Sequence, residues 1–174
     1  RLFGSHVKPA AAALYAAAGT LAATRNQTYH GDITGAGAFA VVNLGYGAQV
    51  TLTGANTYTG GTTVESGLLI LGDGTRLGTL VGGVHLANTD SGLAYNAPGE
   101  TTFDKILTGN GYLQQAGSGT LVVNTNLTFS NDTVADTEPF DGQRNLRISA
   151  GTLRLDPGAD GIGRVAFTNN SLLL

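Results

Sequence analysis

The feature that most constrains this chain is an internal repetition on a scale longer than any single strand or helix. Thr28–Gly37 (TYHGDITGAG) resembles Thr102–Gly111 (TFDKILTGNG), 74 positions later. Ser66–Gly74 (SGLLILGDG) resembles Ala150–Gly158 (AGTLRLDPG), 84 positions later. Further pairs follow in the same order along the chain. Because tandem units bury their apolar faces against one another, this repetition favours a stacked solenoid over a closed domain.

The repetition divides the chain into units of about 72 to 84 residues. Residues 19–91 form the first unit and residues 92–174 the second, which carries an insertion of about eleven residues at Ala135–Asn145. Residues 1–18 match the tail of a preceding unit, although the alanine-rich run at Ala10–Ala18 would also suit a short helix. We therefore expect the whole chain to be one segment of a longer repetitive protein.

Composition indicates that these units consist of β-strands. Charged residues make up only 12% of the chain, about half the ~25% of an ordinary globular domain. Gly, Thr, Asn and Val are abundant, whereas the helix formers Glu, Lys and Met are scarce or absent. Short runs such as Val50–Thr53 and Leu153–Leu155 alternate apolar and polar residues, which is the period of a half-buried strand.

Clusters of Gly, Asn and Asp separate these runs and predict turns. Short strands at this spacing fit an all-β fold, a right-handed single-stranded parallel β-helix of about seven coils with about 20–25 residues each. A meandering sandwich or barrel is the alternative, but the short hairpin turns that it needs are few. In the β-helix, one set of apolar side chains would stack inside, coil above coil: Val50, Leu52, Val64, Leu69, Leu71, Leu121, Val123, Leu153 and Leu155.

Several classes of function are disfavoured by what the sequence lacks. Its nine Lys and Arg residues are spread along the chain and form no basic stripe, so we expect no nucleic-acid partner. No apolar run approaches the ~20 residues of a transmembrane helix. The absence of cysteine removes disulfides, thiolate metal sites and cysteine nucleophiles.

No motif in the chain predicts a catalytic, cofactor or metal site. The histidines stand without a second ligand at metal spacing; they are His6, His30 and His85. The carboxylates that a calcium site needs are dispersed over separate predicted turns; they are Asp32, Asp73, Asp104 and Asp160. We therefore expect no metal ion, no cofactor and no catalysis.

Two groups of polar residues have predicted roles. Asparagines at turn positions are expected to form ladders of amide hydrogen bonds along the stack; they are Asn56, Asn88, Asn126 and Asn169. The insertion is a candidate binding loop, because loops inserted into rigid repeats often carry binding, with a solvated surface loop as the alternative. Its candidate residues are Asp136, Glu138, Asp141 and Arg144.

One continuous stretch resembles a known family. The sequence GANTYTGGTTV at Gly54–Val64, followed by ESGLLILG, closely resembles the passenger-associated transport repeat of autotransporters. The resemblance covers Gly45–Gly72 almost continuously, and the second unit matches in AGSGTLVV (Ala116–Val123) and SAGTLRL (Ser149–Leu155). Between those two matches the second unit departs from the pattern, since Asn126–Val134 replaces the Gly-Gly turn.

This resemblance implies a right-handed parallel β-helix within the passenger of a Gram-negative bacterium. Such a passenger is translocated through an outer-membrane β-barrel that is not present in this chain, and reaches the cell surface or is secreted. The implied role is a non-catalytic structural stalk, in an adhesin or self-associating surface protein. The expected partners are neighbouring coils of the parent chain, a second copy or a host-surface ligand. The β-helical part of a secreted toxin and a carbohydrate-active β-helix enzyme remain alternatives.

Overall fold

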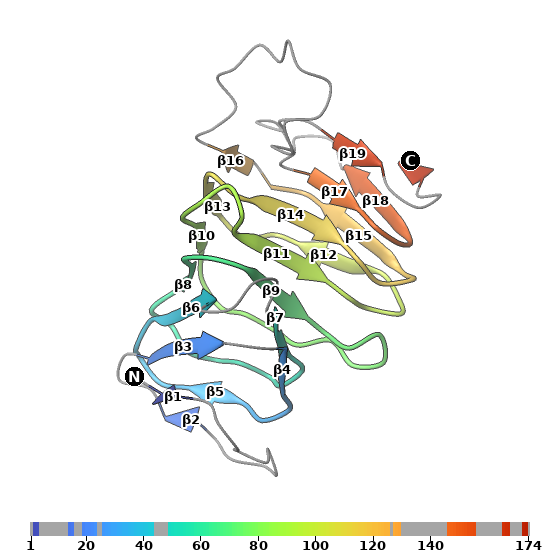
Figure 1. Ribbon diagram of the computed structural model, residues 1–174. Helices are drawn as coiled ribbons and strands as arrows, with labels where there is room; N and C mark the ends of the chain where they lie inside the picture. Colours follow the sequence, from blue (N-terminus) through green and yellow to red (C-terminus); the bar gives the residue numbers. More distant parts are fainter. Residues whose placement is uncertain are drawn as a thin grey trace.

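The alternating apolar residues form short parallel strands, and Figure 1 shows them stacked one above another from the blue end of the chain to the red. The computed structural model describes residues 26–43, 49–125, 127–129 and 146–155, together with strands at 2–3, 14–15, 19–23, 165–167 and 172–173. All regular structure in these residues is β. Among them, no helix is long and apolar enough to cross a membrane.

Each coil of the chain crosses three faces in succession. The first face is a seven-stranded sheet of β1 (Leu2–Phe3), β3 (Gly19–Ala23), β6 (Phe39–Asn43), β8 (Thr62–Val64), β10 (Val84–Leu86), β13 (Leu107–Gly109) and β16 (Leu127–Phe129). The second is a seven-stranded sheet of β4 (Gln27–Tyr29), β7 (Gln49–Leu52), β9 (Leu68–Leu71), β11 (Gly92–Tyr95), β14 (Tyr112–Gln115), β17 (Leu146–Ile148) and β19 (Val165–Phe167). The third holds the pair β2 (Leu14–Tyr15) and β5 (Ile33–Thr34), then the four-stranded sheet β12 (Thr101–Phe103), β15 (Thr120–Val123), β18 (Thr152–Leu155) and β20 (Leu172–Leu173).

The strand register confirms a parallel β-solenoid. Thr62 pairs with Val84, 22 positions later, and Val84 pairs with Leu107, 23 positions later. These separations fall within the predicted coil length. A meandering sandwich or barrel is wrong for this chain, because its neighbouring strands would run antiparallel, whereas each strand pairing in the described residues is parallel.

The predicted number of coils needs correction on the third face. The first two faces hold seven strands each, but the longest sheet on the third face has only four, so turns with a strand on all three faces number about four rather than seven. The reason is local. Between β5 and β12 the chain crosses this face in turns, which meet at the isolated bridge between Ala55 and Thr79.

The core is a set of side-chain columns that run along the axis. On the second face, Val50 pairs with Leu69, Leu69 with Leu93 and Leu93 with Leu113, and these inward side chains are buried. Burial of each such side chain stabilises the fold by about 1.5–3 kcal/mol. Of the nine predicted core residues, eight are buried and Leu155 is partly buried against the same cluster.

Segments that resemble each other in sequence lie on different faces of the solenoid. The SGLLILG segment forms β9 on the second face, whereas AGTLRL forms β18 on the third. Likewise β4 lies on the second face and its counterpart β12 on the third. Thr28 pairs with Thr51, Thr51 with Ile70 and Ile70 with Ala94, so three coils separate Thr28 from Ala94 on the second face. Thr102 then follows on the third face, which completes the separation of 74 residues.

One coil is longer than the others. Leu113 pairs with Leu146, 33 positions later, whereas Leu93 pairs with Leu113, only 20 positions later. The additional residues fall between β16 and β17. The predicted insertion at Ala135–Asn145 belongs to this interval and lies outside the described residues, as do its candidate binding residues Asp136, Glu138, Asp141 and Arg144.

Candidate functional site

Asn56 belongs to the segment Gly54–Val64, called the signature segment below, and it hydrogen-bonds to the coil before it and to the coil after it. Asn56 is fully buried, and its Oδ1 accepts a hydrogen bond of 2.9 Å from the backbone N–H of Ile33, 23 residues earlier. Its Nδ2 donates to the carbonyl of Thr79 at 2.9 Å, 23 residues later, and to the carbonyl of Gly54 at 3.3 Å. Because this face lacks strand pairing at Asn56, the amide supplies the backbone partners that a strand would otherwise provide.

Other asparagines make the same kind of contact at the corners of the coils. Asn88 Nδ2 donates to the carbonyl of Glu65, and Asn110 Nδ2 donates to the carbonyl of Ala87 at 3.4 Å. The predicted amide bonding between coils is therefore confirmed at Asn56 and Asn88. Asn126 and Asn169 lie outside the described residues. Asn110 was missed, although it stands one coil length, 22 positions, after Asn88.

The signature tyrosine is part of the core. Tyr58 is fully buried against Phe39, with ring centroids 5.4 Å apart. Its hydroxyl shares a 2.6 Å hydrogen bond with Thr62 Oγ1. Burial raises the pKa of Tyr58 to about 12, although the bond to Thr62 acts in the opposite direction. The phenol is therefore neutral at physiological pH, and its role in the fold is to fill the coil.

The Gly-Gly turn of the signature is required by close backbone contacts. A Cβ on Gly60 would lie 2.4 Å from the backbone nitrogen of Ala38. Gly61 has a φ of +81°, which side-chain-bearing residues rarely adopt. A Cβ on Gly54 would lie 2.3 Å from the carbonyl oxygen of Gly31. The conspicuous residues of this segment therefore have structural roles.

Three of the four aspartates named from the sequence are engaged within the fold. Asp32 Oδ1 accepts a 2.6 Å hydrogen bond from the backbone of Ala55, and Asp104 pairs with Lys105 at 2.8 Å. Asp73 closes an exposed turn by accepting hydrogen bonds from Thr75 Oγ1 and from two backbone N–H groups, which lower its pKa to about 2. Asp160 lies outside the described residues. Within the described residues, no group of three His, Cys, Asp or Glu side chains is placed to hold a metal ion.

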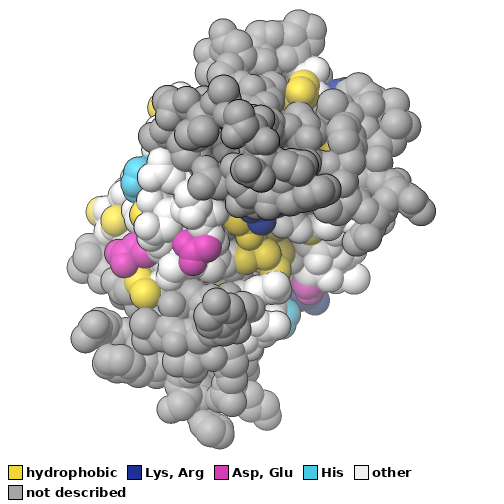
Figure 2. Space-filling model, turned by 45° about the horizontal axis from the view of Figure 1, so that its top comes forward, with side chains coloured by type: hydrophobic (Ala, Val, Ile, Leu, Met, Phe, Trp, Pro, Cys, Tyr) yellow, Lys and Arg dark blue, Asp and Glu magenta, His cyan; other side chains and the backbone are white. Residues whose placement is uncertain are grey.

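Two histidines make the same contact with a threonine one coil later. His30 Nδ1 lies 2.8 Å from Thr53 Oγ1, and His85 Nδ1 lies 3.0 Å from Thr108 Oγ1. Each pair is separated by 23 residues. Both histidines are exposed, whereas His6 lies outside the described residues. Figure 2 shows few charged or histidine side chains on the visible described surface, much of which is white, and some of them lie side by side at its lower right edge.

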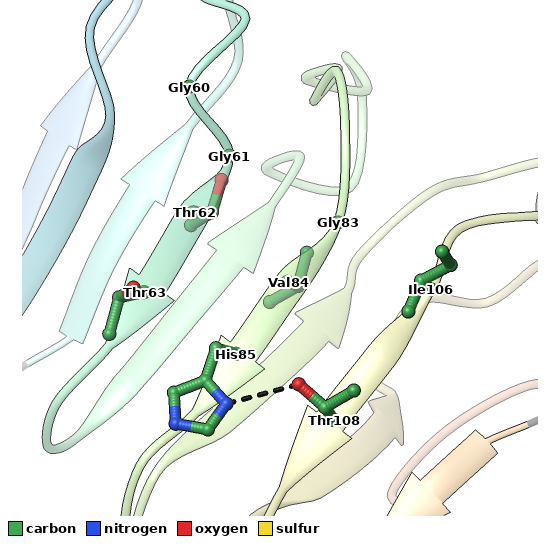
Figure 3. A pocket seen from close by; sticks show the side chains of 9 residues that line it. All are labelled: Gly60, Gly61, Thr62, Thr63, Gly83, Val84, His85, Ile106 and Thr108. Atoms are coloured by element: carbon green, nitrogen blue, oxygen red, sulfur yellow. Dashed lines mark hydrogen bonds between the residues drawn. The ribbon is translucent and has the colours of Figure 1, made fainter.

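A hollow of about 260 Å³ lies on the outer side of the first face, across β8, β10 and β13 (Figure 3). Its lining includes Gly60, Gly61, Gly83, His85 and Ile106. The hollow was not predicted. The sequence held a signal for it, because the pairs Gly60–Gly61 and Gly82–Gly83 are 22 positions apart, one coil length. The remaining lining residues are Thr62, Thr63, Val84 and Thr108.

Comparison with known families identifies the signature coil. Residues 47–71 match the passenger-associated transport repeat, in agreement with the resemblance found at Gly45–Gly72. No significant match was found among curated proteins or among solved structures. This repeat implies a secreted or surface-displayed protein. With its transport repeat at 47–71 and its stack of parallel strands, the chain fits an autotransporter passenger built from β-helix repeats.

Proposed function

We propose that the chain is a non-catalytic structural stalk, which supports secretion of its parent passenger and displays the active part of that passenger at the bacterial surface. The observation that carries this proposal is the triple role of Asn56, which bonds to the coil before it, to its own turn and to the coil after it. The family match at residues 47–71 includes Asn56, so it covers a residue that joins its own coil to the coils before and after it.

The energetics of a solenoid suit secretion through a narrow channel. Each coil contacts only its neighbours, so the chain gains core contacts and hydrogen bonds as each coil emerges. No closure between distant parts of the sequence is needed, and the entropy cost of long loops is avoided. A coil with bonds in both directions, such as the one around Asn56, would hold newly emerged coils on those already folded.

The parent protein is proposed to be an adhesin or a self-associating surface protein of the outer membrane. Support comes from the weakly charged outer surface, which offers threonine hydroxyls for hydrogen bonding, as at Thr63 and Thr128 in the first face. A secreted toxin would place its binding surfaces elsewhere in the parent chain. An enzyme would need grouped acidic or basic catalytic side chains, and the described aspartates are separated from one another in their own turns.

The test is surface display of the parent passenger in a Gram-negative host, with Asn56→Ala compared with Thr57→Ala. Thr57 is exposed in the same turn and makes the matched control. The stalk proposal expects a severalfold lower amount of Asn56→Ala passenger at the surface, with normal display of Thr57→Ala. Equal display of both variants, with Asn56→Ala shown to be unstable in solution, would separate stability from secretion and overturn the proposal.

Cell aggregation tests the finer assignment. Bacteria that display the parent passenger are expected to aggregate or to adhere to host cells, and deletion of the passenger should abolish the effect. Toxicity of the released passenger without adhesion would favour the toxin alternative.

A further inference from the structure

The hollow on the first face forms where two outward positions in one row of the sheet are glycines, which have no side chain. Gly61, Gly83 and Ile106 directly precede the paired residues Thr62, Val84 and Leu107, so they occupy neighbouring places on successive strands. The two glycines leave space, and Ile106 rises beside them with 70% of its surface exposed. In Figure 3, Gly83 lies between Gly61 and Ile106.

One of these glycines is not required by the fold. Gly61 needs its positive φ, but Gly83 has no such backbone conformation. A Cβ on Gly83 would lie 3.4 Å from the carbonyl oxygen of Ile106 and 3.7 Å from its Cβ, which are ordinary contact distances. A side chain at position 83 would therefore start without a backbone clash and would extend toward the hollow.

The next row of the sheet supplies polar groups beside the hollow. Thr63, His85 and Thr108 are partners in register, and each follows an inward residue, so their side chains point outward. The bond to Thr108 engages Nδ1 of His85, and Nε2 lies on the far side of the ring from Thr108, with no partner among the residues drawn. Thr63 has no side-chain hydrogen bond within the described part of the chain.

The lining combines apolar and polar groups. It contains no Asp, Glu, Lys or Arg, so it offers no ion pair to an anionic or cationic ligand. It combines the apolar side chain of Ile106 and bare glycine backbone with hydroxyl groups and an imidazole nitrogen. A neutral sugar ring matches this arrangement, since it has C–H groups on one face and hydroxyls at its rim.

We propose that this hollow binds one neutral sugar unit of a glycan. Its volume of about 260 Å³ lies just below the range of about 300–1,000 Å³ typical of small-molecule pockets, which suits one ring rather than a longer chain. Ile106 and Gly83 would contact the C–H face of the ring. Thr63 Oγ1 and His85 Nε2 would hydrogen-bond to ring hydroxyls, with no bond made or broken in the ligand.

Binding is tested with the full chain by saturation-transfer NMR, using the methyl glycosides of glucose, galactose, mannose and N-acetylglucosamine as probes. At least one of them is expected to bind with a millimolar Kd, as a single small contact area allows. Gly83→Leu should weaken that binding at least about tenfold, a loss of about 1.4 kcal/mol. His85→Ala should weaken it severalfold.

Gly99→Leu is the matched control, because position 99 has open space around it and lies outside the hollow. It should bind like the wild type. Failure of all four glycosides to bind, or equal binding by Gly83→Leu, would overturn the inference. The inference would also be overturned by a dimer of the chain, seen by sedimentation, that Gly83→Leu and Ile106→Ser both abolish. In such a dimer the side chain of Ile106 would fill the hollow of the second copy.

This inference does not rest on the stalk function. Gly83→Leu is expected to leave surface display unchanged, whereas Asn56→Ala is expected to reduce it. The two proposals can therefore fail separately.

Discussion

Asn56→Ala is the change that most directly tests how the coils are held together. The substitution removes a buried amide and leaves the N–H of Ile33 without its partner in a buried position. An unsatisfied buried group costs about 1–3 kcal/mol. The two bonds donated by Nδ2 are also lost, but Thr79 is exposed and its carbonyl regains water. The expected loss in the free energy of unfolding is therefore about 2–4 kcal/mol.

Urea unfolding followed by circular dichroism measures this loss, and hydrogen exchange locates it. The amide of Ile33 should exchange much faster in Asn56→Ala than in the wild type, because opening of this turn then requires less free energy. The control Thr57→Ala should change stability by less than about 0.5 kcal/mol. A loss below about 1 kcal/mol with unchanged protection of Ile33 would refute the view that the amide joins the coils.

Two further substitutions test other contacts. Gly109→Ala should lower the free energy of unfolding by more than about 3 kcal/mol, because the new Cβ would lie 2.0 Å from the carbonyl oxygen of Leu86 and the φ of position 109 is +110°. Gly99→Ala, the control, should be nearly neutral. Similar melting temperatures for the two variants would contradict the reasoning. Tyr58→Phe should cost about 0.5–1.5 kcal/mol at neutral pH, because Thr62 loses its partner. The pKa of Tyr58 is raised to about 12 in the folded state, so the unfolded phenol ionises first, and the wild type should lose stability as pH rises above about 10. Alkaline unfolding that is identical in Tyr58→Phe would show that this phenol is not the titrating group.

The sequence predicts the strands and the core well, because both depend on local alternation. Leu69 and Leu71 alternate with outward residues in the chain, and the structure buries them as expected. Asn56 could also be assigned to coil-to-coil bonding, since it lies in a turn between two apolar runs. These properties follow from a period of two and from turn chemistry, and they need no knowledge of the coil register.

Features that depend on the exact register are harder to predict from the sequence. The two glycine pairs lie one coil length apart in the sequence, but the place of Ile106 beside Gly83 follows only from the strand pairing. The third face was overestimated for a similar reason. Ala55 and Thr79 form an isolated bridge in place of paired strands, and nothing in their local sequence measures how far that pairing extends.

Segments of similar sequence lie on adjacent faces of the solenoid, and this has a consequence for the outer surface of a longer protein. β9 and β18 resemble each other in sequence but lie on adjacent faces, as do β4 and β12. A surface feature copied with this step would therefore be rotated about the axis by about one third of a turn. Three successive copies would point in all directions around the rod. Lengthening the protein would thus repeat such a feature around its whole circumference.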